Sequence, residues 1–266
     1  MRRNGSLTPF ARGPGGYVAP AGEPYIALGN GRRVPNAGCS FRRDDVYALD
    51  SASPGVTLIQ RTGGARRFAG FPAGSFPSSI ALDTGGRFGY RLLVTVLISG
   101  KTTLYSIDCK GRLRVIRRGA PKVEGGSAVA PAAFGRLRGR LVAVDEFTNR
   151  IYAFDQRGRV RVLARPGLPA GQDLGVESLG FVPPGFTSRG AAFMADLGAP
   201  GSPTQGTDSV LVLAGKGLQA RAGDLLVATE AGGVTLRVRC SRRCSVHRIG
   251  RALDATHGEG HIAFSR

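Results

Sequence analysis

Four glutamates stand at the start of short apolar or glycine-rich segments, and they are the first candidates for chemistry in this chain. Glu124, Glu177 and Glu259 occur as Val-Glu-Gly, Val-Glu-Ser and Gly-Glu-Gly, and Glu23 precedes Pro-Tyr-Ile-Ala-Leu. If these segments are equivalent strands around one axis, the carboxylates form a ring that repels itself unless a cation neutralises it or some members hold a proton. Oxygen ligands favour hard ions, above all Ca²⁺. The alternative interpretation is that the glutamates hydrogen-bond neighbouring backbone and fix the register of the strands.

Two of the three histidines lie beside one of these glutamates. His257, Glu259 and His261 are spaced i, i+2 and i+4, which places them on one side of a β-strand. Such a trio predicts a site for Zn²⁺ or another transition metal, or a histidine that acts as a general base. The competing interpretation is that both histidines are solvated or structural, because the intervening glycines weaken the strand pattern.

The four cysteines divide into a close pair and two distant residues. Cys240 and Cys244 flank Ser-Arg-Arg between two alternating segments, which predicts a hairpin whose paired strands bring the two thiols within disulfide distance. The alternative is half of a zinc site, with only His247 nearby. The sequence leaves the pairing of Cys39 and Cys109 open, and free thiols in the core are one alternative. A disulfide favours an oxidising compartment, extracellular or periplasmic.

The elements that must position these residues are visible as a repeat. Residues 46–50, 104–108 and 151–155 read Val-Tyr-Ala-Leu-Asp, Leu-Tyr-Ser-Ile-Asp and Ile-Tyr-Ala-Phe-Asp. A Gly turn and a second alternating segment follow each copy, at residues 55–61, 111–117 and 158–164. Alternation of apolar and polar residues on both sides of a turn predicts a β-hairpin.

Two further strands precede the hairpin in the second and third copies. An apolar segment lies at residues 91–97 and 140–145, and a small-residue segment before it at 79–82 and 124–131. Each repeat thus has four strands, of which the first is rich in small residues and the last alternates with arginine. This order is typical of a β-propeller blade, whose innermost strand approaches the axis and whose outermost strand faces solvent. Arginines on the outermost strand protect an open edge; the candidates are Arg112, Arg114, Arg159 and Arg161.

The sequence therefore predicts an all-β protein, a β-propeller of five or six four-stranded blades. The later segments are less regular, and they fall at 176–182, 191–195, 209–214, 224–229, the cysteine hairpin and 258–264. We expect the last of them to complete the ring beside the first blade. We also expect residues 1–19 to be a flexible lead-in and residues 20–266 to form one domain.

The Tyr-x-x-Asp hairpins, followed by a Gly turn and by inner strands that open in Glu-Gly, resemble the six-bladed NHL and regucalcin/gluconolactonase-like (SMP-30) propellers. The resemblance covers most of residues 20–264 and concerns the fold more than the activity. It implies that Glu124, in Glu-Gly-Gly, corresponds to a glutamate that helps to hold a divalent ion in the lactonases. The Asn and Asp ligands of those enzymes have no clear counterpart here.

The charge and hydropathy limit the partners. The formal net charge is +19, which invites a nucleic-acid interpretation. However, arginines are spread along the chain and there is no Trp, so nucleic acid is an unlikely partner and a solvated basic surface is favoured. No segment has the 18 or so consecutive apolar residues of a membrane span, and no signal peptide is evident at the start of the chain.

Two functions follow from these residues. The first is a monomeric, non-catalytic propeller that binds a small molecule or a protein at the mouth of its channel, with at most a structural divalent cation inside. The second is a metal-dependent hydrolase of the lactone or ester type, in which the cation polarises a carbonyl and a Glu or His activates water. Glycoside cleavage by paired carboxylates is a third and weaker alternative.

Overall fold

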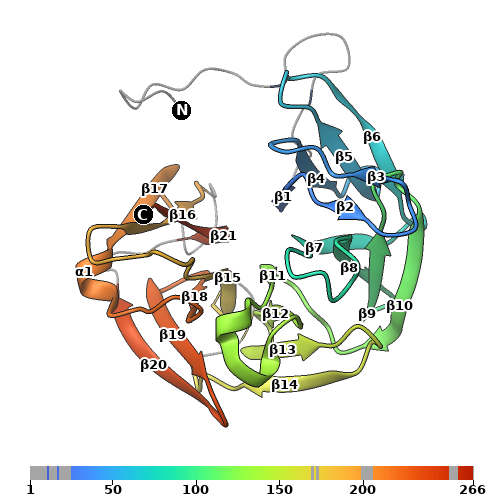
Figure 1. The fold of residues 1–266 in the computed structure, drawn as a ribbon. Helices are drawn as coiled ribbons and strands as arrows, with labels where there is room; N and C mark the ends of the chain where they lie inside the picture. The colour runs from blue at the N-terminus through green and yellow to red at the C-terminus, as the bar shows by residue number, and fades with distance from the viewer. Residues whose placement is uncertain are drawn as a thin grey trace.

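The computed structural model describes residues 11, 17, 25–168, 171, 174–198, 206–251 and 257–265. It confirms the all-β class, with 51% of residues in strands and 4% in helices. The larger sheets stand around a central axis with their innermost strands facing it, which is the arrangement of a propeller (Figure 1). Most of the lead-in predicted over residues 1–19, and Glu23 with it, lies outside the described residues.

Three sheets are four-stranded antiparallel meanders. The first contains β1 (Ile26–Leu28), β4 (Val46–Asp50), β5 (Gly55–Ile59) and β6 (Ala65–Gly70), while β2 (Arg33–Val34) and β3 (Cys39–Ser40) form a separate hairpin. The second contains β7 (Phe76–Leu82), β8 (Leu92–Ile98), β9 (Lys101–Ile107) and β10 (Leu113–Ala120). The third contains β11 (Ser127–Val129), β12 (Leu141–Asp145), β13 (Arg150–Phe154) and β14 (Val160–Ala164), with a 3₁₀ segment, η1 (Ala132–Leu137), between β11 and β12.

The remaining strands form one seven-stranded sheet. Its order is β17 (Ser209–Ala214), β16 (Ala191–Asp196), β21 (Gly258–Ser265), β15 (Val176–Phe181), β18 (Leu225–Thr229), β19 (Val234–Cys240) and β20 (Cys244–Arg251). A single parallel pair, Leu179 with His261, joins β15 to β21, so this sheet consists of a four-stranded and a three-stranded part. The chain leaves the first part after β15, builds β16, β17 and the short helix α1 (Gly215–Leu218), and then returns to β18.

The aspartate of the repeated pentapeptide closes the turn that follows it. Oδ1 of Asp108 accepts hydrogen bonds from the backbone N–H groups of Lys110 and Arg112. Oδ1 of Asp155 accepts the equivalent bonds from Arg157 and Arg159. Side chains of this kind compete well for turn amides, which explains why each copy ends in Asp before its Gly turn.

The position of this pentapeptide within the first sheet differs from the prediction. In the second and third sheets it lies on β9 and β13, the third strands, as expected, but in the first sheet it is β4, the second strand. The reason is that the chain between β1 and β4 forms the β2–β3 hairpin instead of an apolar strand of the sheet. The arginine-bearing outer strand is consequently β6, with Arg66 and Arg67 exposed.

The hydrophobic core lies between neighbouring sheets. Leu92 and Val94 of β8 pack with Tyr47, Leu49 and others between the first two sheets, and equivalent clusters fill the spaces between the second and third sheets and between the third and the seven-stranded sheet. Each such fully buried aliphatic side chain contributes about 1.5–3 kcal/mol. The outer strands β10 and β14 expose Arg114 and Arg161, as the edge-protection argument requires.

Both pairs of cysteines are joined. The predicted disulfide between Cys240 and Cys244 is present at the tip of the β19–β20 hairpin. The pairing of Cys39 and Cys109, which the sequence left open, is a second disulfide with the two Cα atoms 5.9 Å apart, and not a pair of free core thiols. The β2–β3 hairpin, which the sequence pattern did not reveal, is what carries Cys39 across to the turn after β9.

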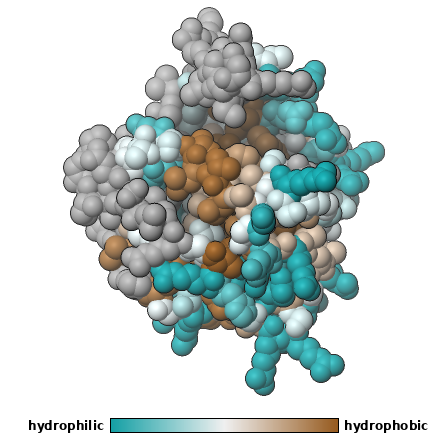
Figure 2. Space-filling view, turned by 90° about the vertical axis from the view of Figure 1, so that its left-hand side faces the viewer, coloured by the Kyte–Doolittle hydropathy of each residue, from teal (hydrophilic) through white to brown (hydrophobic). Residues whose placement is uncertain are grey.

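The last strand was expected to complete the ring beside the first blade. Within the described residues, β21 forms no hydrogen-bonded ladder with the first sheet. It hydrogen-bonds to β16 and β15, and it contacts the first sheet through side chains, because Tyr25 lies against His261. At the other side of β16, β17 is an open edge with Val210 and Val212 each 59% exposed. Figure 2 views the molecule from this side and shows apolar surface between polar neighbours.

None of the described helices has the length and apolar character of a membrane span.

Candidate functional site at the channel mouth

One end of the propeller carries Glu124, Glu177 and Glu259, three of the glutamates that the sequence singled out. Inner strands begin there and second strands finish there, since Val176 pairs with Thr229 and Glu259 pairs with Ala195. Glu177 and Glu259 are the second residues of β15 and β21, and Glu124 stands just before β11, bridged to Asp145 at the end of β12. We refer to this end as the mouth.

The closest group of ligand-type atoms at the mouth is formed by Glu230, His257 and Glu259. Nε2 of His257 lies 3.3 Å from Oε1 of Glu230 and 3.2 Å from Oε1 of Glu259. One ligand atom from each of the three residues lies within 4.8 Å of the other two, and all three residues are buried. An imidazole between two carboxylates is suited either to holding a cation or to sharing a proton.

The backbone of this group is held by Asp196 at the end of β16. Oδ1 of Asp196 accepts a hydrogen bond from the N–H of His257, and Oδ2 accepts two from Thr207. Burial raises the pKa of Asp196, but these hydrogen bonds outweigh it and leave the pKa below its ordinary value. Asp196 is therefore ionised at neutral pH and fixes the start of β21.

Tyr25, just before β1, directs its hydroxyl group towards Glu259 of this group. The hydroxyl oxygen lies 3.5 Å from Oε2 of Glu259, which is a long hydrogen bond. Through this contact the first sheet reaches the last inner strand of the ring.

Glu177 is buried beside the group, against the loop that leads into β11. A Cβ atom on Gly125 would lie only 2.6 Å from Oε2 of Glu177, and Gly125 has a φ of +124°. The N–H of Gly126 also donates to the backbone carbonyl of Glu177. The glycines of the Glu-Gly-Gly segment thus make room for the carboxylate of the next inner strand.

Glu124 is engaged by a lysine instead. Its Oε2 lies 2.7 Å from Nζ of Lys122, and the same ammonium group stands over the ring of Phe147. Neighbouring Asp145 is completely buried. Burial, opposed by the hydrogen bond from Thr148 and by Lys122, raises its pKa, and the charge of Glu124 raises it further.

His261 lies apart from His257 and Glu259, in contrast to the expected same-side trio. Gly260 has a φ of +77°, and the pairing of β16 with β21 shifts between Phe193 and Ala195, so a bulge interrupts the alternation. His261 instead lines a cavity of about 280 Å³ in the channel, together with residues of β1, β7 and β11. Burial lowers its pKa to about 4, so the imidazole is neutral at pH 7.

Glu230 was not among the residues predicted from the sequence. A signal was present: residues 141–146 and 225–230 read Leu-Val-Ala-Val-Asp-Glu and Leu-Leu-Val-Ala-Thr-Glu, so Glu146 and Glu230 occupy matching positions at the ends of the second strands β12 and β18. Both are buried. The mouth is therefore supplied with carboxylates from the second strands as well as from the inner strands.

Comparison with known proteins gives likeness only to solved structures. No protein-family model and no curated protein matches the chain. A protein of unknown function from Bacteroides caccae is 10% identical, with a TM-score of 0.46 over 85% of this chain and 59% of that chain. Virginiamycin B lyase from Staphylococcus aureus is 10% identical, with a TM-score of 0.44 over 84% of this chain and 73% of that chain.

A protein named as a putative oxidoreductase (glucose dehydrogenase) from Thermus thermophilus is 17% identical, with a TM-score of 0.41 over 91% of this chain and 88% of that chain. The chain thus spans less than two thirds of the length of the Bacteroides caccae protein. Likenesses this weak carry no argument about activity. The propeller assignment rests on the arrangement of this chain's own sheets.

Proposed function

We propose that this chain is a propeller binding module of five blades, the last three-stranded, whose mouth binds one divalent cation through Glu230, His257 and Glu259. The observation that carries the proposal is the convergence of two carboxylates and an imidazole, all buried, from two neighbouring parts of the seven-stranded sheet. Two carboxylates and an imidazole are the donor types that divalent transition-metal cations bind in proteins.

The spacing of the ligand atoms fits an ion. Ligands about 2.1 Å from a tetrahedral Zn²⁺ are separated from one another by about 3.4 Å. The two distances from Nε2 of His257 to the carboxylate oxygens, 3.3 and 3.2 Å, are close to this ligand-to-ligand separation. Six oxygens around Ca²⁺ have a similar separation, so the donor type decides between the ions. The imidazole favours Zn²⁺ over the Ca²⁺ that a ring of carboxylates alone predicts.

A second candidate function is a metal-dependent hydrolase of the lactone or ester type. Three protein ligands leave a tetrahedral ion one position for water, and an ion in such a site lowers the pKa of that water. The side chains of Glu230, His257 and Glu259 are only 4–7% exposed, which limits the approach of a substrate carbonyl. This burial favours the binding module over the hydrolase.

The remaining properties of the proposed module follow the sequence predictions. Its ligand is a small molecule or a protein at the mouth, and it acts as a monomer. Two disulfides favour an oxidising location, outside the cytoplasm.

The test is the metal content of the full chain purified without chelators and then exposed to Zn²⁺ or Ca²⁺ and desalted. We expect about one ion per chain, reduced at least tenfold in Glu230→Gln and in His257→Gln. Glu124→Gln is the matched control, because it removes the same charge from a glutamate that pairs with Lys122, and it is expected to retain the ion.

A folded protein that retains no ion at millimolar Zn²⁺ or Ca²⁺ contradicts the proposal. Hydrolysis of lactones or esters by the metal-loaded protein, lost in Glu230→Gln and retained in Glu124→Gln, would replace the binding module by the hydrolase.

A further inference from the structure

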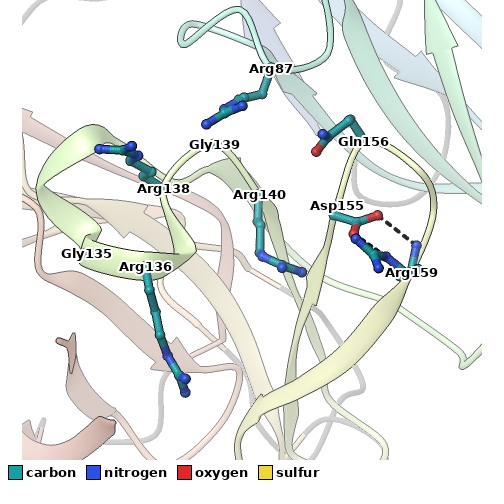
Figure 3. A pocket seen from close by; sticks show the side chains of 9 residues that line it. All are labelled: Arg87, Gly135, Arg136, Arg138, Gly139, Arg140, Asp155, Gln156 and Arg159. Carbon is teal, nitrogen blue, oxygen red and sulfur yellow. Dashed lines mark hydrogen bonds and ion pairs between the residues drawn. The ribbon is translucent and has the colours of Figure 1, made fainter. Parts of the chain in front are cut away.

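A cavity at the opposite end of the propeller is lined by arginines. It has a volume of about 490 Å³. Three segments build it: the loop from β7 to β8 with Arg87, the segment from η1 to β12, and the turn from β13 to β14 with Arg159 (Figure 3). Because β7 and β13 finish at this end, whereas inner strands begin at the mouth, the cavity is separate from the glutamate cluster.

The charge in this cavity is strongly unbalanced. Its lining residues are Arg87, Gly135, Arg136, Arg138, Gly139, Arg140, Asp155, Gln156 and Arg159. The one carboxylate, Asp155, is already engaged by Arg159, with Nε 2.7 Å from Oδ2. Within the described part of the chain, no ion pair within 4.0 Å is formed by the other four arginines. Four guanidinium groups are therefore available to an anion.

The loop carrying three of these arginines is held by close packing. Gly139, with a φ of +71°, lies so close to the side chain of Arg87 that a Cβ atom would collide with it. At Gly135, with a φ of +64°, a Cβ atom would lie 2.9 Å from the carbonyl oxygen of Cys240. The loop is thus seated on the disulfide-closed tip of the β19–β20 hairpin. The backbone that carries these arginines therefore needs little ordering when a ligand binds.

The like charges also affect one another. Burial, together with the positive charges of Arg140 and Arg136, lowers the pKa of Arg161 on neighbouring β14. Repulsion of this kind is relieved when an anion binds among the arginines.

We propose that this cavity binds a compact polyanion that carries at least two phosphate or carboxylate groups. The planar guanidinium group donates two parallel hydrogen bonds to an oxyanion, which makes arginine the usual residue for such groups. A volume of about 490 Å³ is within the range of small-molecule sites. Among the described residues that line this cavity none is aromatic, and Phe88 of a neighbouring cavity is buried in the core. Neither cavity therefore offers an open ring for stacking on a nucleobase, as single-stranded nucleic-acid sites do.

The neighbouring cavity extends the site. It has a volume of about 400 Å³, shares Arg87 and Gln156 with the first, and adds Arg91, Arg114 and Arg157. A polyanion with several charged groups in a row reaches from one cavity into the other.

The test is calorimetric titration of the full chain with sodium tripolyphosphate and, separately, with citrate, in 50 mM and 200 mM NaCl. We expect saturable binding of at least one of them and at least a tenfold weaker affinity for the double variant Arg138→Gln/Arg140→Gln. The matched control is Arg43→Gln/Arg66→Gln, which removes the same charge from two exposed positions, Arg43 in the turn before β4 and Arg66 on β6, and is expected to change the affinity less than twofold.

The comparison of the two probes distinguishes phosphate from carboxylate. Absence of binding, or equal weakening in the cavity and control variants, would mean diffuse attraction to a basic surface and would overturn the proposal. Duplex DNA that binds more tightly than both probes and is weakened equally by both double variants would overturn it too.

A second measurement avoids substitutions. Phenylglyoxal modifies accessible arginines, and mass spectrometry locates the modified residues. We expect tripolyphosphate to protect Arg87, Arg138 and Arg140 at least fivefold but to leave Arg66 unprotected. Equal protection of Arg66 would contradict a specific site.

Discussion

Cys39 and Cys109 are 70 residues apart in the sequence and are joined by a disulfide that connects the β2–β3 hairpin to the turn after β9. The bond therefore links the region of the first sheet to the second sheet. Cys240 and Cys244, by contrast, close a loop within a single hairpin. The two disulfides differ in what they contribute to stability.

Removal of the Cys39–Cys109 bond, by Cys39→Ser/Cys109→Ser, is expected to lower the free energy of unfolding by about 4 kcal/mol, because the bond closes a long loop in the unfolded chain. Cys240→Ser/Cys244→Ser is expected to lower it by about 2 kcal/mol, because its loop is short. Chemical unfolding of both double variants measures the difference. A larger loss from the short loop would contradict this account.

Asp224→Asn is expected to lower the free energy of unfolding by about 1–3 kcal/mol at pH 7. Asp224 is buried and accepts two hydrogen bonds from Arg239, from Nε to Oδ1 at 2.8 Å and from Nη2 to Oδ2 at 2.6 Å. Burial raises the pKa of Asp224, but the hydrogen bonds from Arg239 outweigh it and lower the pKa overall.

The pH dependence follows from that direction. A carboxylate with a lowered pKa in the folded state stabilises the fold above its unfolded pKa of about 3.9, and this stability is lost as the pH falls through the lower, folded value. The difference in unfolding free energy between wild type and Asp224→Asn should therefore be constant from pH 7 to 5 and shrink below about pH 4. A difference that is unchanged at pH 3 would show that the ion pair is not its source.

Gly125→Ala is expected to lower the free energy of unfolding by about 3 kcal/mol or more, because it adds strain at positive φ to overpacking against buried neighbours. A Cβ atom there would lie 2.6 Å from Oε2 of Glu177 and 2.8 Å from Cγ2 of Val144. Gly119 is the matched control, since its φ is +65° and no atom lies within 4 Å of its added Cβ. Gly119→Ala should cost about 1 kcal/mol, and equal losses in thermal or urea unfolding would show that the contact with Glu177 is unimportant.

Val210→Lys is expected to reduce self-association at high concentration and to change the free energy of unfolding by less than about 0.5 kcal/mol. The other outer strands carry arginines, for example Arg66 on β6 and Arg161 on β14, but β17 has no charged residue. Sedimentation velocity measures the effect. Leu28→Lys, on the inner strand β1 and 56% exposed, should leave association unchanged; an equal effect of both variants would assign it to net charge.

How much of this protein was predictable depends on the range of the interactions involved. The Tyr-x-x-Asp hairpins were predictable, because alternation of residues and the hydrogen bonds of Asp108 and Asp155 to their own turns act over a few residues. The Cys240–Cys244 bond was predictable for the same reason. The glutamates at the starts of β15 and β21 could be placed on inner strands from their repeated context.

Only part of the candidate site could be predicted from the sequence. Glu259 and His257 were predicted as neighbours, but Glu230 joins them from the end of β18, 27 residues before His257. The separation of His261 depends on a bulge at Gly260, where the pairing with β16 shifts. A local pattern does not contain such a shift, because it arises from the register of two strands that are far apart in the chain.

The all-β class, the repeating hairpins, the short-loop disulfide and the excess of arginine follow from residue types and short spacings, and so they can be predicted without coordinates. The path of the chain from β15 through β16 and β17 and back to β18, and the meeting of Cys39 with Cys109, depend on how the sheets pack. The same holds for the meeting of Glu230 with His257 and for the cavity that arginines from three segments share. These contacts depend on which sheets become neighbours around the axis, and that is settled by burial summed over the whole ring and not by any single segment.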